Sequence, residues 1–213
     1  MEVFDTLLKC YGPLHWWPAE TPAEVCVGAI LTQNTNWTNV EKAIANLRRE
    51  GMLTLEALWE IDRERLAELI RPSGFFNVKS ARLKDFVGWL LDRHGSLEAM
   101  FSGDWRELRE ELLAVRGVGR ETCDSILLYA GGKPSFVVDA YTRRLFSRLG
   151  LVSESDGYEQ VRSIFMEALP ADSGLFNEYH ALIVEHCKRH CRKKPLCGGC
   201  PLGKLCRCSC LLP

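Results

Sequence analysis

The sequence predicts an all-α fold, and three observations support this. Apolar residues recur with helical spacing in ten segments of the chain. Turn-forming glycines and prolines separate these segments. Residues 135–138 alone have the character of an extended strand, and this stretch is too short to form a sheet. The predicted helical segments are 22–31, 38–50, 54–70, 78–93, 96–101, 104–114, 121–130, 139–149, 156–168 and 173–190.

The boundaries of these segments carry residues that start and stop helices. Thr21 precedes Pro22 and is followed three residues later by Glu24, a pattern typical of a helix start. The chain of 213 residues contains no internal repeat and is long enough for one domain or for two small ones that share a core. The predicted stops are Gly51, Pro72-Ser73-Gly74, Gly95, Gly117-Val118-Gly119, Gly131-Gly132-Lys133-Pro134, Gly150 and Pro170.

The composition excludes several classes of protein. With 27 Lys and Arg against 28 Asp and Glu the formal net charge is -1, so binding to a polyanion through bulk charge is not expected. Hydrophobic residues make up 46% of the chain, which excludes a disordered tail protein. No apolar run approaches the ~20 residues of a membrane helix, and the first 11 residues lack a secretion signal. We expect a cytoplasmic protein.

The cysteines and the charges are unevenly distributed along the chain. Seven of the ten cysteines fall within residues 187–213, which also carry seven Lys and Arg and no acidic residue. The first 186 residues therefore have a net charge of -8. Because the cytosol keeps thiols reduced, the cysteines indicate a metal centre or cluster rather than disulfides.

A glycine hairpin joins two of the predicted helices at Arg116-Gly117-Val118-Gly119-Arg120. Glycine permits backbone conformations closed to other residues and lets a rod-like ligand approach the backbone. The N–H groups of Gly117, Gly119 and Arg120 would then face outward at a helix start, which suits a phosphate oxygen. A plain helix–helix turn explains Gly-x-Gly equally well.

Asp139 begins the predicted helix 139–149, directly after Val137 and Val138. An aspartate at such a place is most often only a helix N-cap. Because apolar residues precede it, we expect its carboxylate to lie in a poorly hydrated cleft. There it can also oppose positive charge that develops on a sugar during cleavage of a glycosidic bond. Arg143 and Arg144 follow on the next turn and are candidates to hold backbone phosphates.

The chain resembles the endonuclease III superfamily of helix-hairpin-helix base-excision DNA glycosylases in three features. These are the run 113–123, the run Val137-Val138-Asp139 and the cysteines of the tail. The resemblance spans about Trp16 to Cys206 and implies a two-lobed all-α fold with the active site between the lobes. The first lobe would comprise residues 20–132 with six helices and the hairpin, and the second residues 1–19 and 133–213. It further implies that Asp139 is the catalytic aspartate and that a monomer acts on double-stranded DNA with a damaged base. A monovalent cation at the hairpin is implied when DNA is bound.

The residue two positions after the second hairpin glycine decides the reaction type. Members of the superfamily that also cut the DNA backbone carry a lysine there, whose amine forms a Schiff base with the sugar. This chain has Glu121, and a carboxylate cannot form an imine. An acid in the first turn of a helix is also favourable in its own right. The absence of lysine predicts a monofunctional glycosylase in which Asp139 positions a water molecule for attack on C1′ of a flipped nucleotide.

Aromatic residues near the N-terminus predict a base pocket. The two rings of Trp16-Trp17-Pro18 cannot both lie on one buried stripe of a helix, so at least one should face a cleft. Without further information, tryptophans with a structural role are the more common case. With the runs 28–35 and 72–79, this stretch is similar to the 3-methyladenine DNA glycosylase III branch. That resemblance implies a pocket of Trp16, Trp17 and Pro18, with Trp37 stacked on the base, and it implies that Gln33 and Asn77 probe the duplex. An indole binds a cationic alkylated purine well.

Four cysteines of the tail predict a cluster loop at residues 191–206. Cys191, Cys197, Cys200 and Cys206 are separated by five, two and five residues, a spacing that fits a [4Fe–4S] cluster better than zinc. The commonest pattern of the superfamily has six residues in the first gap, and Cys187 lies one turn before Cys191, but its use would need a gap of nine. Cys187, Cys208 and Cys210 receive no role. Basic residues between the ligands would meet DNA phosphates: Lys193, Lys194 and Lys204.

Three other functions stay open at this point. An oxidised-pyrimidine glycosylase with lyase activity is opposed by Glu121. A glycosylase for mispaired adenine would carry an additional domain, which we do not expect after Pro213. A non-catalytic DNA-binding or redox-sensing iron–sulfur protein would keep the cluster without the chemistry. The leading expectation is excision of alkylated purines of the 3-methyladenine type.

Overall fold

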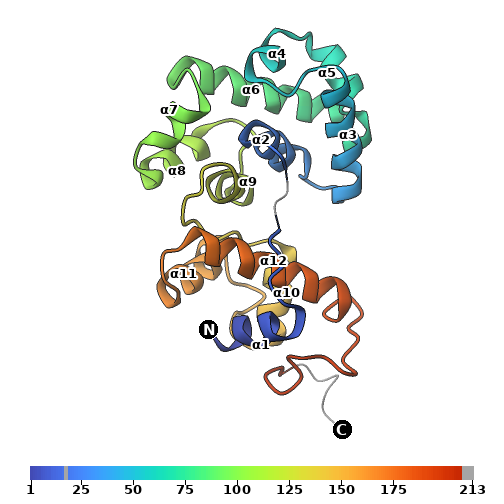
Figure 1. Cartoon of the computed structure of the whole chain (residues 1–213), viewed down its shortest axis with the longest axis vertical. Coiled ribbons are helices and arrows are strands. Elements are labelled where there is room, and N and C mark those ends of the chain that lie inside the picture. Colours follow the sequence, from blue (N-terminus) through green and yellow to red (C-terminus); the bar gives the residue numbers. More distant parts are fainter. Residues whose placement is uncertain (17–18, 208–213) are drawn as a thin grey trace. The chain divides into compact units, whose positions relative to one another are not determined.

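The computed structural model describes residues 1–16 and 19–207 of the chain (Figure 1). Within these residues the regular structure is entirely helical and no strand occurs, so the predicted fold class is confirmed. By its contacts the chain divides into two units, one of Met1–Trp16 with Pro134–Pro213 and one of Trp17–Lys133. None of the described helices is long and apolar enough to cross a membrane.

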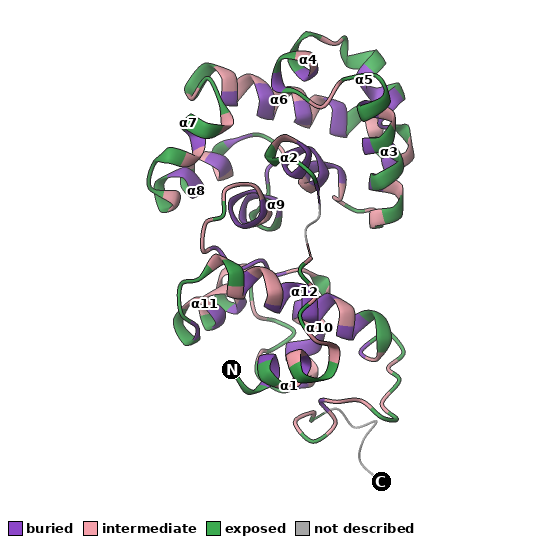
Figure 2. Ribbon diagram, in the orientation of Figure 1, coloured by how far each residue is buried: buried purple, intermediate pink, exposed green. Residues whose placement is uncertain are grey.

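The unit of residues 17–133 packs its helices around one apolar core. Thr21 caps the first helix through its side chain, which accepts a hydrogen bond from Glu24 N at 3.2 Å as the sequence pattern predicts. Figure 2 shows this helix, α2, as mostly buried, because its residues face neighbours on nearly every side. The elements are α2 (Pro22–Leu31), α3 (Trp37–Arg49), α4 (Leu55–Glu60), α5 (Arg63–Leu69), the 3₁₀ turn η1 (Arg71–Ser73), α6 (Phe76–Arg93), α7 (Leu97–Ser102), α8 (Trp105–Ala114), α9 (Arg120–Ser125) and the π-helical η2 (Ile126–Ala130).

The predicted helix 54–70 is two helices in the structure. α4 ends at Glu60 and α5 begins at Arg63. The Lys84 ammonium on α6 donates to the carbonyl oxygens of Trp59, at 2.5 Å, and Ile61. A side chain far along the sequence thus satisfies carbonyls at the end of α4 that a continuous helix would bond internally.

The unit of residues 1–16 and 134–213 has an aromatic core. The Phe136 and Phe165 rings stack with centroids 3.9 Å apart, and Tyr179 meets Phe136 edge-on at 5.9 Å. The helix at residues 2–11 is absent from the ten predicted segments, and it buries Phe4 against Tyr179 at 5.1 Å. The helices of this unit are α1 (Glu2–Tyr11), α10 (Ala140–Arg148), α11 (Tyr158–Ala168) and α12 (Ser173–Arg189).

The tail, residues 190–207, contains no helix and is attached to α10 through Arg148. The Arg148 guanidinium donates to the carbonyl oxygens of Arg192 at 2.7 Å and Lys193 at 3.0 Å. The carbonyl oxygen of Arg148 accepts from Arg207 N at 3.1 Å. One residue of α10 therefore binds both ends of the tail.

Candidate functional site

Asp139 is the N-cap of α10, and this role uses one of its two carboxylate oxygens. Oδ1 accepts hydrogen bonds from Thr142 N at 2.7 Å and from Thr142 Oγ1 at 2.9 Å. The preceding Val137 and Val138 are buried, so Asp139 lies at the edge of the core with a side chain only 14% exposed. Capping therefore leaves Oδ2 for other partners.

The Oδ2 atom of Asp139 faces His180 of α12, at 3.5 Å from Nε2. Burial raises the pKa of Asp139, but the nearby His180 ring and the two hydrogen bonds from Thr142 outweigh it, so that the pKa lies below its ordinary value of 3.8. His180 is not among the residues that the sequence patterns predicted for the site. It lies 41 positions after Asp139 on a largely buried helix, where a lone histidine resembles a core residue.

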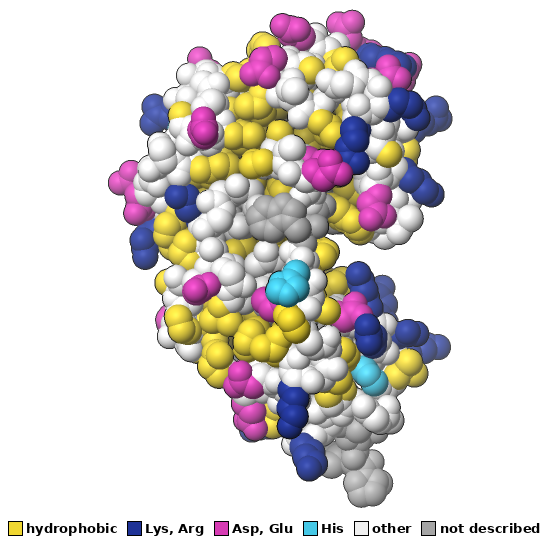
Figure 3. All heavy atoms as spheres, viewed as in Figure 1, with side chains coloured by type: hydrophobic (Ala, Val, Ile, Leu, Met, Phe, Trp, Pro, Cys, Tyr) yellow, Lys and Arg dark blue, Asp and Glu magenta, His cyan; other side chains and the backbone are white. Residues whose placement is uncertain are grey.

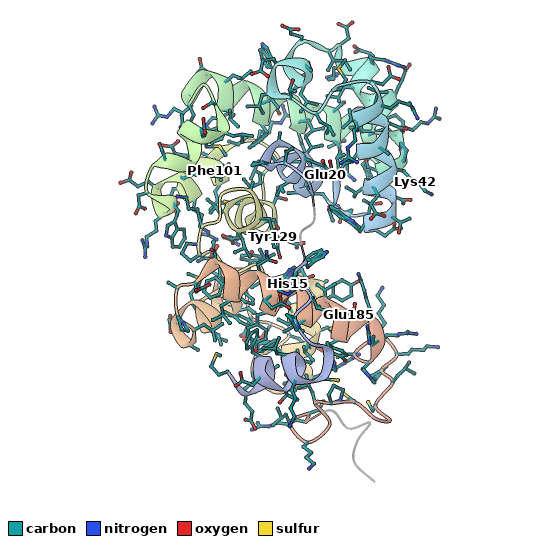
Figure 4. The ribbon with its side chains drawn as sticks, viewed as in Figure 1. His15, Glu20, Lys42, Phe101, Tyr129 and Glu185 are labelled. Carbon is teal, nitrogen blue, oxygen red and sulfur yellow. The ribbon has the colours of Figure 1, made fainter. Side chains whose placement is uncertain are left out.

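The Trp16 ring lies close to the His180 ring. The Trp16 and His180 rings are tilted by 35° with centroids 6.0 Å apart. Glu178 holds the segment before Trp16 because its carboxylate accepts from Leu14 N at 2.5 Å and His15 N at 3.1 Å. Figure 4 shows His15 beside α12. This unit therefore brings Trp16, His180 and Asp139 together, whereas Trp17 and Pro18 lie outside the described residues.

The hairpin 116–120 belongs to the unit of residues 17–133. Of its two glycines, the first, Gly117, cannot be replaced without strain. Gly117 has φ of +88°, and a Cβ there would lie 2.3 Å from Cγ of Arg82. Gly119 precedes α9 with φ of -86°, and a Cβ there would meet nothing within 4 Å. Val118 is buried, while Gly119, Arg120 and Glu121 are exposed. The turn thus presents its second glycine to solvent.

Gln33 is bonded to this hairpin. Its Nε2 donates to the Gly117 carbonyl oxygen and to Thr122 Oγ1, both at 2.9 Å. Its Oε1 accepts from the Arg82 guanidinium, the same side chain that packs on Gly117. Trp37, the other predicted pocket residue of this unit, is partly buried and packs against Gly28, where a Cβ would lie 3.4 Å from its ring.

Three described residues other than glycine adopt the left-handed backbone conformation. They are His15, Asn34 and Phe75, with φ of 48°, 54° and 46°. Each lies beside or near a residue predicted to contact the ligand, namely Trp16, Gln33 and Asn77. Such strain persists where the surroundings impose it, and it is concentrated at functional sites. Phe75, which the sequence analysis did not identify, is 68% exposed and lies two residues from the exposed Asn77.

The two arginines after Asp139 are bonded within their own unit. Arg143 donates to the Asp156 carbonyl oxygen at 2.5 Å, and Arg144 donates through Nε to the Cys191 carbonyl oxygen at 2.8 Å. The Arg144 guanidinium also lies 5.0 Å from the centre of the Tyr141 ring. Figure 3 shows Lys and Arg side chains gathered over the C-terminal end of α12, whose last turn carries Lys188 and Arg189.

One pocket is lined by all four predicted cluster cysteines, Cys191, Cys197, Cys200 and Cys206. In the described part of the chain no three His, Cys, Asp or Glu side chains converge closely enough to hold a single metal ion. A four-iron cluster binds its cysteines at different irons, so its ligands surround a cavity rather than converge on a point. The donor set therefore fits such a cluster.

The surroundings of this pocket favour a thiolate at Cys191, whereas burial raises the pKa of Cys200. The neighbouring Cys187 thiol and the Arg148 guanidinium lower the pKa of Cys191 against the opposing effect of burial. The His186 ring also lines the pocket, 3.8 Å from Cys200 Sγ, and its other nitrogen lies 3.0 Å from the Tyr11 hydroxyl. The α1 helix thereby reaches the cysteine pocket.

The chain is similar in sequence and in fold to known DNA repair proteins. A family model described as HhH-GPD superfamily base excision DNA repair protein matches residues 27–171. One relative is a Methanocaldococcus jannaschii protein that is named as a proposed DNA repair glycosylase. It is 52% identical over 207 residues, which cover 96% of this chain and 94% of that protein. The H. pylori 3-methyladenine DNA glycosylase bound to 1,N6-ethenoadenine has a TM-score of 0.76 at 31% identity and covers 88% of this chain and 96% of its own.

A trapped covalent endonuclease III–DNA intermediate is also similar in structure. Its TM-score is 0.81 at 25% identity, with 96% of this chain and 92% of that chain covered. The family match spans more than half of the sequence, and the helical fold agrees along nearly all of it. The chain therefore belongs to the HhH-GPD superfamily of base excision DNA repair proteins, as a DNA glycosylase of the endonuclease III superfamily.

Proposed function

We propose that this protein is a monofunctional DNA glycosylase that flips alkylated purines of the 3-methyladenine type out of double-stranded DNA and removes them by hydrolysis. The observation that carries the proposal is the juxtaposition of Trp16, His180 and Asp139. The His180 ring lies close to both the aromatic ring of Trp16 and the buried carboxylate of Asp139. The similarity to a glycosylase solved with 1,N6-ethenoadenine supports a modified purine as the substrate.

Asp139 would supply the charge that the reaction needs. Cleavage of the glycosidic bond develops positive charge on the sugar, which a nearby carboxylate stabilises. Oδ1 is held by Thr142, so the carboxylate cannot rotate freely and Oδ2 keeps its direction. The same carboxylate can accept a proton from the water that attacks C1′.

Trp16 would select the base. An indole face attracts a cationic ring more strongly than a neutral one, and 3-methyladenine-type bases are cationic. Such bases also leave readily, so little acid catalysis is required from the protein. We also assign base binding to Trp17 and Pro18, and stacking on the base to Trp37.

Glu121 supports hydrolysis without cleavage of the DNA backbone. It occupies the exposed first turn of α9, immediately after the hairpin, where lyases of the superfamily carry lysine. A carboxylate at this position cannot attack the sugar to give a Schiff base. We therefore expect the reaction to end at an abasic site.

The DNA contacts would come from a few placed groups. The exposed Gly119 and Arg120 suit phosphates, with Gly117 shaping the turn. The exposed ring of Phe75, two residues before Asn77, suits insertion between base pairs. Gln33 and Asn77 would probe the duplex. In the other unit, contacts would come from Arg143, and from the terminal nitrogens of Arg144, whose Nε bonds Cys191.

Cys191, Cys197, Cys200 and Cys206 would hold a [4Fe–4S] cluster in the pocket that they line. The cluster would cross-link the tail and fix its loops. Lys193, Lys194 and Lys204 are exposed on these loops and would bind phosphates in a salt-dependent way. We expect the protein to act on DNA as a monomer in the cytoplasm.

One excision panel tests the proposal. Duplexes containing 3-methyladenine, 7-methylguanine, thymine glycol or adenine opposite 8-oxoguanine are incubated with the protein and with Asp139→Asn, and released bases and strand breaks are measured separately. We expect release of the methylated purines without strand cleavage, no adduct on borohydride treatment, and loss of release but not of DNA binding in Asp139→Asn. A borohydride-trapped complex, or release of thymine glycol alone, would overturn it.

A further inference from the structure

We infer that His180 is a positioning residue of the reaction, which holds the Asp139 carboxylate ionised and correctly oriented for base excision. The inference rests on the catalytic role proposed for Asp139. It adds to that role a partner on a different helix, which connects the carboxylate to the ring of Trp16.

The geometry assigns each oxygen of Asp139 to a separate partner. Thr142, on the same helix, takes Oδ1 through its backbone N–H and its hydroxyl. His180, on α12, lies 3.5 Å from Oδ2. A carboxylate held by two elements cannot follow the movement of either one alone, so its direction is fixed relative to the core of this unit.

The electrostatics explain why a partner is needed. Transfer of a carboxylate from water into a poorly hydrated site favours its protonated form, which could not stabilise a cationic sugar. The two Thr142 donors oppose this effect, and the His180 ring adds a cation or a ring N–H donor at Oδ2. The side chains of Asp139 and His180 are 14% and 6% exposed, so water screens the interaction little.

Among the described residues, the other titratable and charged groups around Asp139 do not supply a positive charge or a donor to its Oδ2 atom, so this role falls to His180. Cys187 also faces Asp139 from α12 but carries no positive charge. On α10, Arg143 and Arg144 donate to carbonyl oxygens of Asp156 and Cys191. The segment before Trp16 brings the Glu178 carboxylate to Leu14 and His15, where it bonds to backbone N–H groups.

The test titrates Asp139 directly in the full-length, cluster-loaded protein. Carbon-13 NMR of labelled aspartate carboxyls, with the Asp139 signal assigned by its absence from Asp139→Asn, gives the pKa with and without His180. His180→Leu removes both charge and donor, and His180→Gln keeps an amide donor. His94→Gln, in the other unit, is the matched control. Single-turnover excision is measured on the same variants from about pH 4 to about pH 8.

We expect His180→Leu to raise the pKa of Asp139 by about 1–3 units. The acidic limb of its excision profile should move up by the same amount, while affinity for an abasic-site duplex stays unchanged. His180→Gln should fall between His180→Leu and the wild type, and His94→Gln should match the wild type. An Asp139 titration that is the same in His180→Leu and in the wild type would overturn the inference.

The two readouts separate this inference from the proposed function. The NMR titration needs no substrate, so it tests the His180–Asp139 interaction even if the excision panel identifies a different base. If the panel succeeds and the variants share one pH profile, the inference alone fails. If His180→Leu does not fold, the comparison of His180→Gln with His94→Gln still decides the outcome, because both retain a polar side chain.

Discussion

Two arginines hold the two segments proposed to meet DNA, and they do so in opposite ways. Arg109 of α8 forms a buried pair with Asp124 of α9, with Nε–Oδ1 of 2.8 Å and Nη2–Oδ2 of 3.1 Å, across the two helices that flank the hairpin. Arg148 instead binds backbone carbonyls of a tail without helices. The helices that flank the hairpin are therefore joined by a buried ion pair, whereas the tail is bonded through its backbone carbonyls to two arginines of α10, Arg148 and Arg144.

The largest effect is expected from Arg109→Leu. It would leave the Asp124 carboxylate, which is completely buried, without its guanidinium. Breaking a buried pair from one side lowers the free energy of unfolding by about 3–5 kcal/mol. Urea denaturation of the intact protein measures this. Arg106→Leu, on the same helix with an exposed guanidinium, should stay within about 1 kcal/mol of wild type. Equal effects of the two changes would show that the buried Arg109–Asp124 pair does not stabilise the helices that flank the hairpin.

A smaller effect is expected from Gly117→Ala. The new Cβ would enter a left-handed conformation and contact Arg82, which also holds Gln33. We expect a loss of about 1–3 kcal/mol in the free energy of unfolding. Gly119→Ala is the control, because that position has a negative φ and open space around it. Thermal unfolding compares the two, and a more stable Gly117→Ala would contradict the geometry described for the turn.

Arg148→Met should act locally. Loss of its bonds to Arg192 and Lys193 costs about 1–2 kcal/mol, which we expect to appear mainly as faster hydrogen exchange in residues 191–207. Exchange in the hairpin and its flanking helices should not change. Arg192→Met, which loses the bond from Nε to the Lys188 carbonyl oxygen, provides the comparison. Exchange that rises equally in both regions would show that the tail is not an independent element.

The smallest effects concern DNA affinity. Arg120→Ala in the hairpin and Lys204→Ala in the tail each remove one exposed cation. Each should reduce the slope of log K against log salt by about 1 and weaken binding a few-fold, without changing which base is removed. Titrations of a labelled duplex at several salt concentrations measure the slope. An unchanged slope for Lys204→Ala would show that Lys204 does not bind a phosphate.

The sequence was most informative where structure depends on neighbouring residues. The Thr21 cap, the glycine turn at residue 117 and the position of Asp139 at a helix start all follow from local patterns. It was least informative where distant segments meet. The Lys84 ammonium breaks a predicted helix by bonding carbonyls 23 and 25 residues away, and His180 reaches Asp139 across 41 positions. Periodicity indicates which face of a helix is buried, but not which partner it meets.

The left-handed residues His15, Asn34 and Phe75 have a practical consequence for engineering. Glycine adopts this conformation without strain, so replacing any of the three with glycine could relieve about 1 kcal/mol. A library selected only for heat resistance would therefore be drawn to these positions. If the flanking side chains contact DNA as proposed, such variants would survive heating better and repair less. Selection for stability and selection for repair would then separate at these three codons.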